Sequence, residues 1–170
     1  LINHAKALNI DINKIVIMGS SAGGHLALMG GLLADNSLFD ASCKAQEKVK
    51  VAAIINKYGV ADLSEDAEIE HASSRTVMYW LGNKFTDLSF RKSISPLYHI
   101  DKNSPPVFTI HGDTDPTVPY QQSVKLHQKL KSLGVKNQLF TIKGGLHGNF
   151  PADQNAEATK QMFDFLKGIG

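Results

Sequence analysis

Residues 15–30, IVIMGSSAGGHLALMG, change character at their middle. The first four are apolar and rich in β-branched side chains, which is typical of a buried strand. The last part spaces its apolar residues as one face of a helix does. Between the two parts, residues 19–23 read GSSAG and match the pattern G-x-S-x-G at a strand-to-helix junction. The sequence therefore predicts a sharp turn that presents Ser21 as a nucleophile.

Such a turn places specific demands on its residues. It holds Ser21 in a strained backbone conformation that keeps the hydroxyl clear of the chain. Side chains two residues away would collide with their neighbours, so we expect glycine to be required at both Gly19 and Gly23. The following helix aims its free N–H groups and its dipole at the same point, which makes the Ala22 N–H the expected oxyanion donor.

Other kinds of glycine loop fit less well. A phosphate-binding loop needs a lysine after the glycines, and none follows here. A dinucleotide-binding turn needs a second glycine where Ser21 stands. Ser20 lacks the symmetric glycines of a nucleophile, and a purely structural glycine-serine turn remains the alternative.

A serine nucleophile needs a base, and the base needs a carboxylate that orients it. The segment TIHGDTDPTVP follows an apolar run and offers Asp113 and Asp115, and TIKGGLHGNF follows another and offers His147. We choose Asp115 as the acid because it lies beyond the turn, whereas Asp113 is expected to cap or turn locally. Ser21, Asp115 and His147 follow one another along the chain in the order expected for a nucleophile that stands on a strand-to-helix turn. The alternative is that His147 is a surface histidine by chance.

Strand and helix patterns alternate along the chain. We expect strands at 14–18, 49–56, 105–112 and 137–144, and helices at 2–8, 21–33, 120–134 and 153–169. Because the strands look apolar on both faces, they predict an α/β fold: a mostly parallel sheet with helices on both sides. In the last helix the residues expected to face inward are Ala156, Met162, Phe163 and Leu166.

The segment 58–104 lacks a comparable strand and predicts small helices and loops that cover the site. Its apolar residues Met78, Tyr79 and Trp80 are expected to pack in the core or in a lid rather than to contact substrate. Substrate specificity is nevertheless expected to be set in this segment. Outside the site, we expect His25 to make a buried hydrogen bond and His111 to anchor its loop.

Composition excludes several classes of protein. The 170 residues suit one domain, and 18 basic against 16 acidic residues are too balanced for nucleic-acid binding. No apolar run approaches the roughly 18 to 20 residues that cross a membrane. A single cysteine, Cys43, excludes an internal disulfide framework or a cysteine-rich zinc site, and no H-E-x-x-H occurs. We therefore expect no metal or other cofactor; no signal peptide is visible, and the compartment stays open.

At the level of family, the sequence resembles serine esterases of the α/β-hydrolase superfamily. The segments GSSAGGHLAL, SPPVFTIHGDTDPTVPYQQS and GGLHGNF, together with YGVADL and ISPLYHID, resemble carboxylesterases and acetyl or feruloyl carbohydrate esterases. The resemblance spans nearly the whole chain and implies Ser21 as nucleophile, Asp115 as acid and His147 as base. It also implies a small-molecule ester, short-chain or sugar-linked, as the substrate.

The sequence departs from that family at its front, where no H-G-G oxyanion loop precedes Gly19. We expect a single hydrolase domain that is the C-terminal two-thirds of a longer one, with an exposed sheet edge through which copies could self-associate. The expected activity is ester hydrolysis through an acyl-enzyme. The alternatives are a prolyl-oligopeptidase-type serine peptidase and a non-catalytic binding module with the same fold.

Overall fold

The computed structural model describes residues 2–33, 50–64 and 74–169. Its sheet has four parallel strands in the order β1-β2-β3-β4. The strands are β1 (Val16–Ser20), β2 (Ala53–Lys57), β3 (Val107–Gly112) and β4 (Asn137–Ile142). Because all four run the same way, their carboxyl ends meet at one edge of the sheet, where the loops that carry Ser21, Asp115 and His147 begin.

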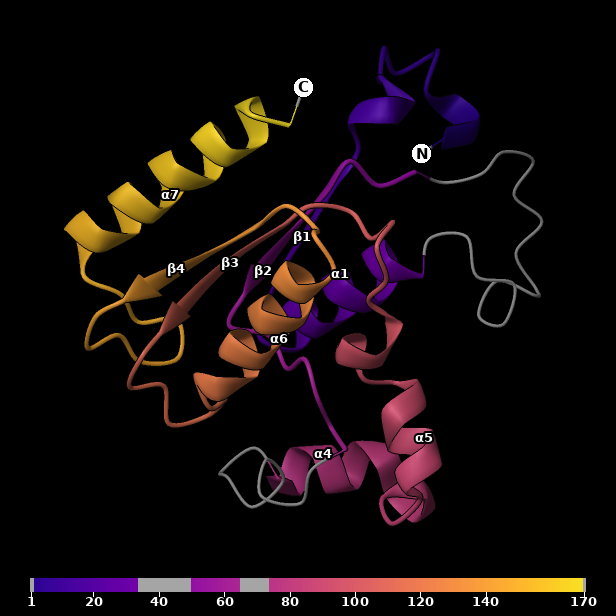
Figure 1. Ribbon diagram of the computed structural model, residues 1–170, viewed down its shortest axis with the longest axis vertical. Helices are drawn as coiled ribbons and strands as arrows, with labels where there is room; N and C mark the ends of the chain where they lie inside the picture. The colour runs from indigo at the N-terminus through magenta and orange to yellow at the C-terminus, as the bar shows by residue number, and fades with distance from the viewer. Residues whose placement is uncertain (1, 34–49, 65–73, 170) are drawn as a thin grey trace.

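Helices cover both faces of this sheet. The α-helices of the described residues are α1 (Ala22–Leu32), α4 (Ser74–Leu81), α5 (Leu88–Ser93), α6 (Gln121–Ser132) and α7 (Ala152–Lys167), of which α1, α6 and α7 pack on the sheet. Four short 3-10 helices accompany them: Ile2–His4, Ile12–Lys14, Gly82–Lys84 and Pro96–His99. Figure 1 shows α1 and α6 on one side of the sheet and α7 on the other. The predicted α/β fold with a parallel sheet is confirmed.

The predicted elements differ most from the structure in the first third of the chain. Residues 2–8 form one 3-10 turn and further turns instead of a helix, since only Ala5 is buried there and little packing supports helical structure. The first strand begins at Val16 and reaches Ser20, because Ile12–Lys14 forms a 3-10 helix. The second strand begins at Ala53, where its pairing with β1 starts.

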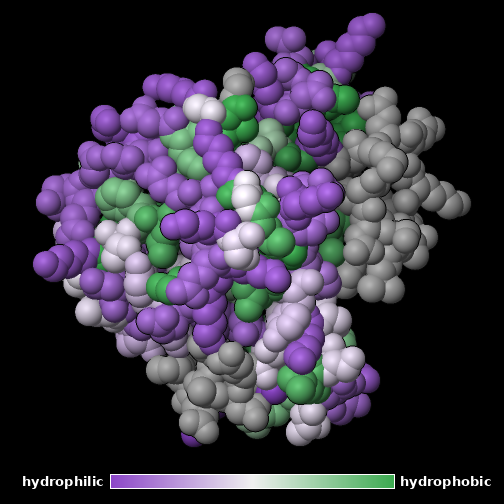
Figure 2. Space-filling view, viewed as in Figure 1, coloured by the Kyte–Doolittle hydropathy of each residue, from purple (hydrophilic) through white to green (hydrophobic). Residues whose placement is uncertain are grey.

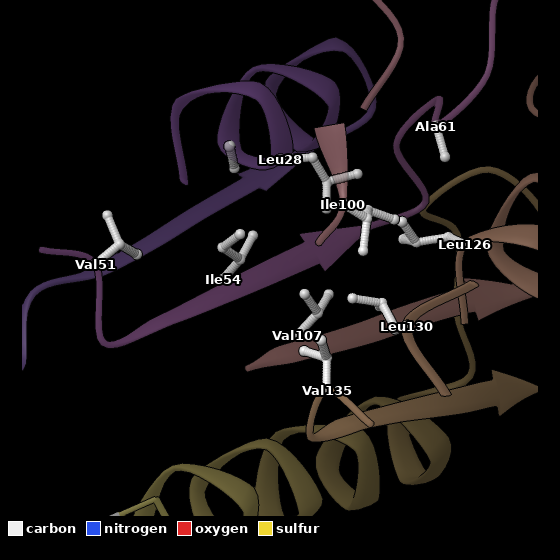
Figure 3. Close-up of a cluster of buried hydrophobic side chains, with 10 residues drawn as sticks. Leu28, Val51, Ile54, Ala61, Ile100, Val107, Leu126, Leu130 and Val135 are labelled. Atoms are coloured by element: carbon white, nitrogen blue, oxygen red, sulfur yellow. The ribbon is translucent and has the colours of Figure 1, made fainter. Parts of the chain in front are cut away.

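The larger part of the core lies between the sheet and helices α1 and α6. Ile54 of β2 and Val107 of β3 meet Leu28 of α1 and Leu126 and Leu130 of α6, and all five are fully buried (Figure 3). Burying each leucine or isoleucine contributes about 1.5–3 kcal/mol. This cluster fixes α1, and with it the start of the Ser21 turn, against the middle of the sheet.

A second cluster lies under α7. Ala158 and Phe165 are buried against β3 and β4, where the Phe108 and Phe165 rings lie 5.4 Å apart. Ala156 and Phe163, which were expected to face inward, are exposed. With 3.6 residues per turn, burying Ala158 and Phe165 turns these two positions outward.

The first strand lacks such a cover on one face. Val16 is 40% exposed and Met18 58% exposed, because α7 packs on β3 and β4 rather than on β1. The expectation that every strand is covered on both faces was therefore wrong for β1. In the described sheet β1 also lies at an edge, with a paired neighbour, β2, on one side only.

The segment between β2 and β3 contains no strand among its described residues, as expected. Its helices α4 and α5 lie at the end of the molecule opposite the chain termini (Figure 1). The face shown in Figure 2 is largely hydrophilic, with small hydrophobic areas between the polar side chains. None of the helices in the described part of the chain combines the length and the apolarity needed to cross a membrane.

Candidate active site

The turn between β1 and α1 is as sharp as the sequence predicted. Ser21 has φ 55° and ψ −122°, a backbone conformation that residues other than glycine rarely adopt. The Ser21 N–H donates to the Lys57 carbonyl at 2.8 Å, which fastens the turn to the end of β2. A Cβ atom on Gly19 would lie 1.9 Å from the Gly23 carbonyl oxygen, so this position admits only glycine.

The expectation for Gly23 was wrong. A Cβ atom there would meet nothing within 4 Å, because it would point away from the turn. The steric demand falls one residue later, at Gly24, where a Cβ would lie 2.5 Å from Asn56 Oδ1 and 3.0 Å from the Gly59 Cα. Helix α1 thus approaches the segment after β2 through Gly24.

Ser21, His147 and Asp115 form a continuous chain of hydrogen bonds. His147 Nδ1 lies 2.7 Å from Asp115 Oδ2, and His147 Nε2 lies 2.8 Å from Ser21 Oγ. Because a carboxylate only accepts, Nδ1 carries the proton in this arrangement and Nε2 accepts from the Ser21 hydroxyl. The structure therefore brings the three predicted residues together from the ends of three strands.

Asp115 is held from several directions. Its side chain is fully buried, and its Oδ1 accepts from the Thr117 N–H at 2.8 Å and the Val118 N–H at 2.9 Å. Its Oδ2 lies 2.7 Å from His147 Nδ1 and also 3.2 Å from His111 Nε2. These partners leave the carboxylate little freedom to turn away from His147.

His111 anchors this loop, as expected. Its Nε2 donates to the Val118 carbonyl at 3.0 Å, and its Nδ1 accepts from the Ser123 hydroxyl at 2.6 Å. Burial lowers the pKa of His111, although the bond to Val118 and the nearby Asp115 carboxylate act in the opposite direction. Its proximity to Asp115 was missed, since the sequence pattern carries no signal of which side chain reaches the acid.

Asp113 does more than the local capping that was expected. Its Oδ1 accepts from the Gly144 N–H at 2.6 Å and so joins the loop after β3 to the loop after β4. A Cβ on Gly112 would lie 2.1 Å from the Gly145 carbonyl oxygen, which shows how closely the two loops pack. Asp113 does not contact His147; it positions the loop that carries His147.

An aromatic ring lies against the imidazole of His147. The Tyr58 ring centroid lies 4.8 Å from that of His147 at an angle of 66°, and Phe150 packs edge-on against Tyr58 at 5.6 Å. Tyr58 itself has φ 43°, so its backbone is strained as well. Gly148 has φ 75°, and a Cβ there would lie 2.6 Å from the Tyr58 hydroxyl. No local pattern in the sequence indicates this contact of Tyr58 with His147.

The start of α1 lies beside Ser21. Ala22 is its first residue, and N–H groups in a first helical turn have no partner within the helix. His25, one turn later, is buried and donates from Nδ1 to the Val60 carbonyl at 3.0 Å, which confirms its expected hydrogen bond. Burial lowers the pKa of His25, and the bond to Val60 opposes that effect.

Met78, Tyr79 and Trp80, which were predicted to pack in the core or in a lid, do not lie in the core. They are 50%, 87% and 59% exposed, because α4 turns Leu81 toward the protein interior instead. Trp80 lines a largely apolar pocket of about 320 Å³ whose wall also includes Ala22, the residue after Ser21.

Within residues 2–33, 50–64 and 74–169, no group of three or more His, Cys, Asp or Glu side chains is arranged to hold a metal ion. Cys43 lies outside the described residues.

A protein-family model, BD-FAE, matches residues 1–130 of the chain. The chain belongs to the BD-FAE family. Among curated proteins, esterase LipC from Mycobacterium tuberculosis is 29% identical over 145 residues, which are 81% of this chain and 35% of LipC. The chain thus spans about a third of the length of this relative.

Solved structures show the same architecture. A truncated form of a carbohydrate esterase from gut microbiota superimposes with a TM-score of 0.79 and 27% identity, covering 98% of this chain and 63% of that one. A puromycin-hydrolyzing peptidase from Mycobacterium tuberculosis gives a TM-score of 0.75 and 25% identity, covering 99% of this chain and 24% of that one. The expected resemblance to esterases with the α/β-hydrolase fold is confirmed.

Proposed function

We propose that this chain carries the catalytic residues of a carboxylic ester hydrolase that works through an acyl-enzyme. The observation that carries the proposal is the pair of hydrogen bonds from Ser21 to His147 and from His147 to Asp115, at 2.8 and 2.7 Å. The match to the BD-FAE family and the similarity to named esterases support the same chemistry.

The proposed reaction begins at the strained turn. His147 Nε2 removes the Ser21 proton as Oγ attacks the ester carbonyl carbon, and a tetrahedral intermediate forms. The Ala22 N–H, at the positive end of α1, stabilises the oxyanion. His147 then gives its proton to the oxygen of the leaving alcohol, and the acyl group stays on Ser21. A water molecule, deprotonated by His147, releases the acid and restores Ser21.

Asp115 orients the base in this scheme. Its carboxylate keeps the proton of the neutral imidazole on Nδ1, which leaves Nε2 free to accept the Ser21 proton. The same carboxylate stabilises the imidazolium that forms during attack. The two backbone N–H groups of Thr117 and Val118 hold the carboxylate in place for both tasks.

For the substrate we propose an ester with a short-chain or sugar-linked acyl group. The support is the carbohydrate esterase relative. The puromycin-hydrolyzing peptidase relative favours a second candidate, a serine peptidase with the same three residues. Hydrolysis of 4-nitrophenyl acetate without cleavage of a prolyl amide supports the esterase, and the opposite pattern supports the peptidase.

Covalent labelling tests the nucleophile. A fluorophosphonate reacts with an activated serine, so we expect one labelled peptide, modified at Ser21, and no labelling of the Ser21→Ala variant. Ser20→Ala is the matched control, because Ser20 is the adjacent hydroxyl at the end of β1, and this variant should label like the wild type. Labelling at Ser20 would contradict Ser21 as the nucleophile, and no labelling at all would support a non-catalytic module with this fold.

We also propose that copies of the chain self-associate through β1. Its unpaired edge and the exposed Val16 and Met18 are the supporting observations. An edge strand offers unpaired backbone groups to another chain.

A further inference from the structure

The apolar pocket beside Ser21 has walls from three parts of the chain. Residues of α1, of the loop after β2 and of α4 line it: Ala22, His25, Leu26, Val60, Leu63, Thr76, Val77 and Trp80. Leu26 is 63% exposed and Trp80 59% exposed, so two large apolar side chains face solvent at this opening. Exposed apolar side chains gathered next to a reactive group are typical of a surface that a ligand covers.

The direction of the reaction indicates which half of an ester enters this pocket. His147 Nε2 must reach the oxygen of the leaving alcohol to protonate it, so the alcohol lies on the side of Ser21 where His147 stands. None of the residues that line the pocket belongs to the loop that carries His147. Ala22, the proposed oxyanion donor, does line it. The pocket therefore lies where the acyl chain extends from the carbonyl carbon.

We propose that this pocket binds the acyl chain of the ester and that the Trp80 indole is the wall on which a chain of about four to eight carbons packs. The proposal rests on the proposed function, because it takes Ser21 as the attacking residue. The pocket volume of about 320 Å³ is larger than a two-carbon acyl group needs. An acetyl group would leave most of that space empty.

The chemistry of the wall favours an uncharged, apolar chain. Among the described residues that line the pocket, only His25 and Thr76 are polar, and none of these described residues carries a permanent charge. His25 already donates from Nδ1 to the Val60 carbonyl, and burial disfavours its protonated form. A carboxylate or ammonium group at the end of the acyl chain would find no opposite charge in this wall.

His25 also holds Trp80 in place. The two rings meet edge to face, with centroids 5.8 Å apart and an interplanar angle of 85°. Such a contact is typical of stable aromatic pairs and fixes the plane of the indole. Because Trp80 remains 59% exposed, a face of the indole is free for a ligand.

Chain-length selectivity tests the proposal by kinetics. Each methylene group buried in the transition state raises kcat/KM about fourfold. Because the pocket is open to solvent and buries only part of the chain, we expect kcat/KM for 4-nitrophenyl hexanoate to be at least about tenfold that for 4-nitrophenyl acetate. Trp80→Ala should lower this hexanoate-to-acetate ratio at least about fivefold, whereas Trp80→Phe should keep most of it. Tyr79→Ala is the matched control, because Tyr79 is 87% exposed on the same helix and does not line the pocket. Comparing ratios between variants cancels the intrinsic reactivity of each ester.

A binding experiment separates the pocket from catalysis. Trp80 is the only tryptophan of the chain, so its fluorescence reports on the pocket even in Ser21→Ala, which cannot form an acyl-enzyme. We expect methyl hexanoate to change this fluorescence saturably and methyl acetate to have little effect at equal concentration.

The outcomes distinguish the two proposals. Wild-type turnover with an unchanged ratio in Trp80→Ala, and no fluorescence response to methyl hexanoate, would overturn the acyl pocket and leave the ester hydrolase standing. A saturable response in a protein that hydrolyses no ester would retain the apolar site and overturn the proposed function. A charged chain such as methyl succinate binding as well as methyl hexanoate would also contradict the proposal.

Discussion

At the scale of the residue, the position of His147 depends on contacts at both ring nitrogens and with one neighbouring aromatic ring. Asp115 holds Nδ1 at 2.7 Å, Ser21 lies 2.8 Å from Nε2, and the Tyr58 ring packs against the imidazole. A base held in this way needs little reorganisation before it accepts a proton. We therefore expect a large loss of catalytic activity when any one of these partners is removed.

Removal of the base tests this directly. We expect His147→Ala to lower kcat for a nitrophenyl ester by about 10⁴- to 10⁶-fold, because no other group can accept the Ser21 proton. Circular dichroism should show an unchanged fold, since His147 lies in a loop. His25→Ala is unsuitable as a control because His25 lines the acyl pocket; exposed His4→Ala serves instead and should retain full activity. Near-wild-type turnover by His147→Ala would remove it from the mechanism.

The two aspartates of the loop after β3 provide a matched pair. Asp115→Asn keeps the shape but stabilises the wrong imidazole tautomer, so we expect kcat to fall by about 10⁴-fold. Asp113→Asn removes only the charge on the bond to the Gly144 N–H, and its loss should be far smaller. The steady-state kcat values of the two variants show which aspartate orients His147. A larger loss of kcat in Asp113→Asn than in Asp115→Asn would contradict the assignment of Asp115 as the acid.

At the scale of the element, the junction of β1 and α1 decides whether the site forms. Gly19→Ala would place a Cβ 1.9 Å from the Gly23 carbonyl oxygen, so we expect a loss of stability of about 3 kcal/mol or a failure to fold. Gly23→Ala meets open space within the helix and should change stability by less than about 1 kcal/mol, in the stabilising direction. Urea unfolding measures the stability of both variants. Equal destabilisation by Gly19→Ala and Gly23→Ala would contradict the close contact at Gly19 and the open space at Gly23.

The order of these elements was readable in the sequence, and their tertiary neighbours were not. The apolar run before Gly19 and the serine turn predicted β1, α1 and Ser21 because both signals are local. Asp115 and His147 followed from the rule that parallel strands end at a common edge. The contact of Tyr58 with His147 joins segments far apart in the chain, and no periodicity reports it.

Packing between elements explains the mistakes about individual faces. In α7 the apolar positions span more than one face, and only the sheet surface decides that Phe165 is buried while Phe163 is exposed. The exposure of Trp80 has the same origin, since α4 packs inward through Leu81. The local sequence pattern indicates that a helix has an apolar face. Which residues of that face become buried depends on the surface against which the helix packs.

At the scale of the whole molecule, buried histidines couple stability to pH. Burial lowers the pKa of His127 below its ordinary value, while the hydrogen bond with Asn137 acts against this shift. The unfolded chain therefore binds the proton first, and this contribution to stability, fully present above about pH 6.5, is lost as pH falls toward the lower folded-state pKa.

The variant His127→Gln removes one of these titrating groups. We expect its free energy of unfolding to depend less steeply on pH below about 6.5 than that of the wild type. Urea midpoints measured across this range give the slope. His4→Gln, at an exposed position, should reproduce the wild-type slope. An unchanged slope in His127→Gln would show that its proton is not coupled to folding.

Self-association through β1 is a second property of the whole molecule. A lysine in an edge strand disfavours pairing with another chain, so Met18→Lys should shift the sedimentation coefficient toward that of the monomer. Phe163→Lys is the control, because Phe163 is similarly exposed but lies on α7, and it should leave the association unchanged. A monomeric wild-type chain at all concentrations would contradict the proposal.

Direct trapping of the covalent intermediate tests the central claim most closely. The chain is mixed with 4-nitrophenyl butyrate, quenched in acid before turnover is complete, and digested for peptide mapping by mass spectrometry. The account predicts a butyryl group on Ser21 in the wild type and none in His147→Ala over the same interval. A butyryl group on another residue, or ester hydrolysis with no acylated peptide at any time, would contradict it.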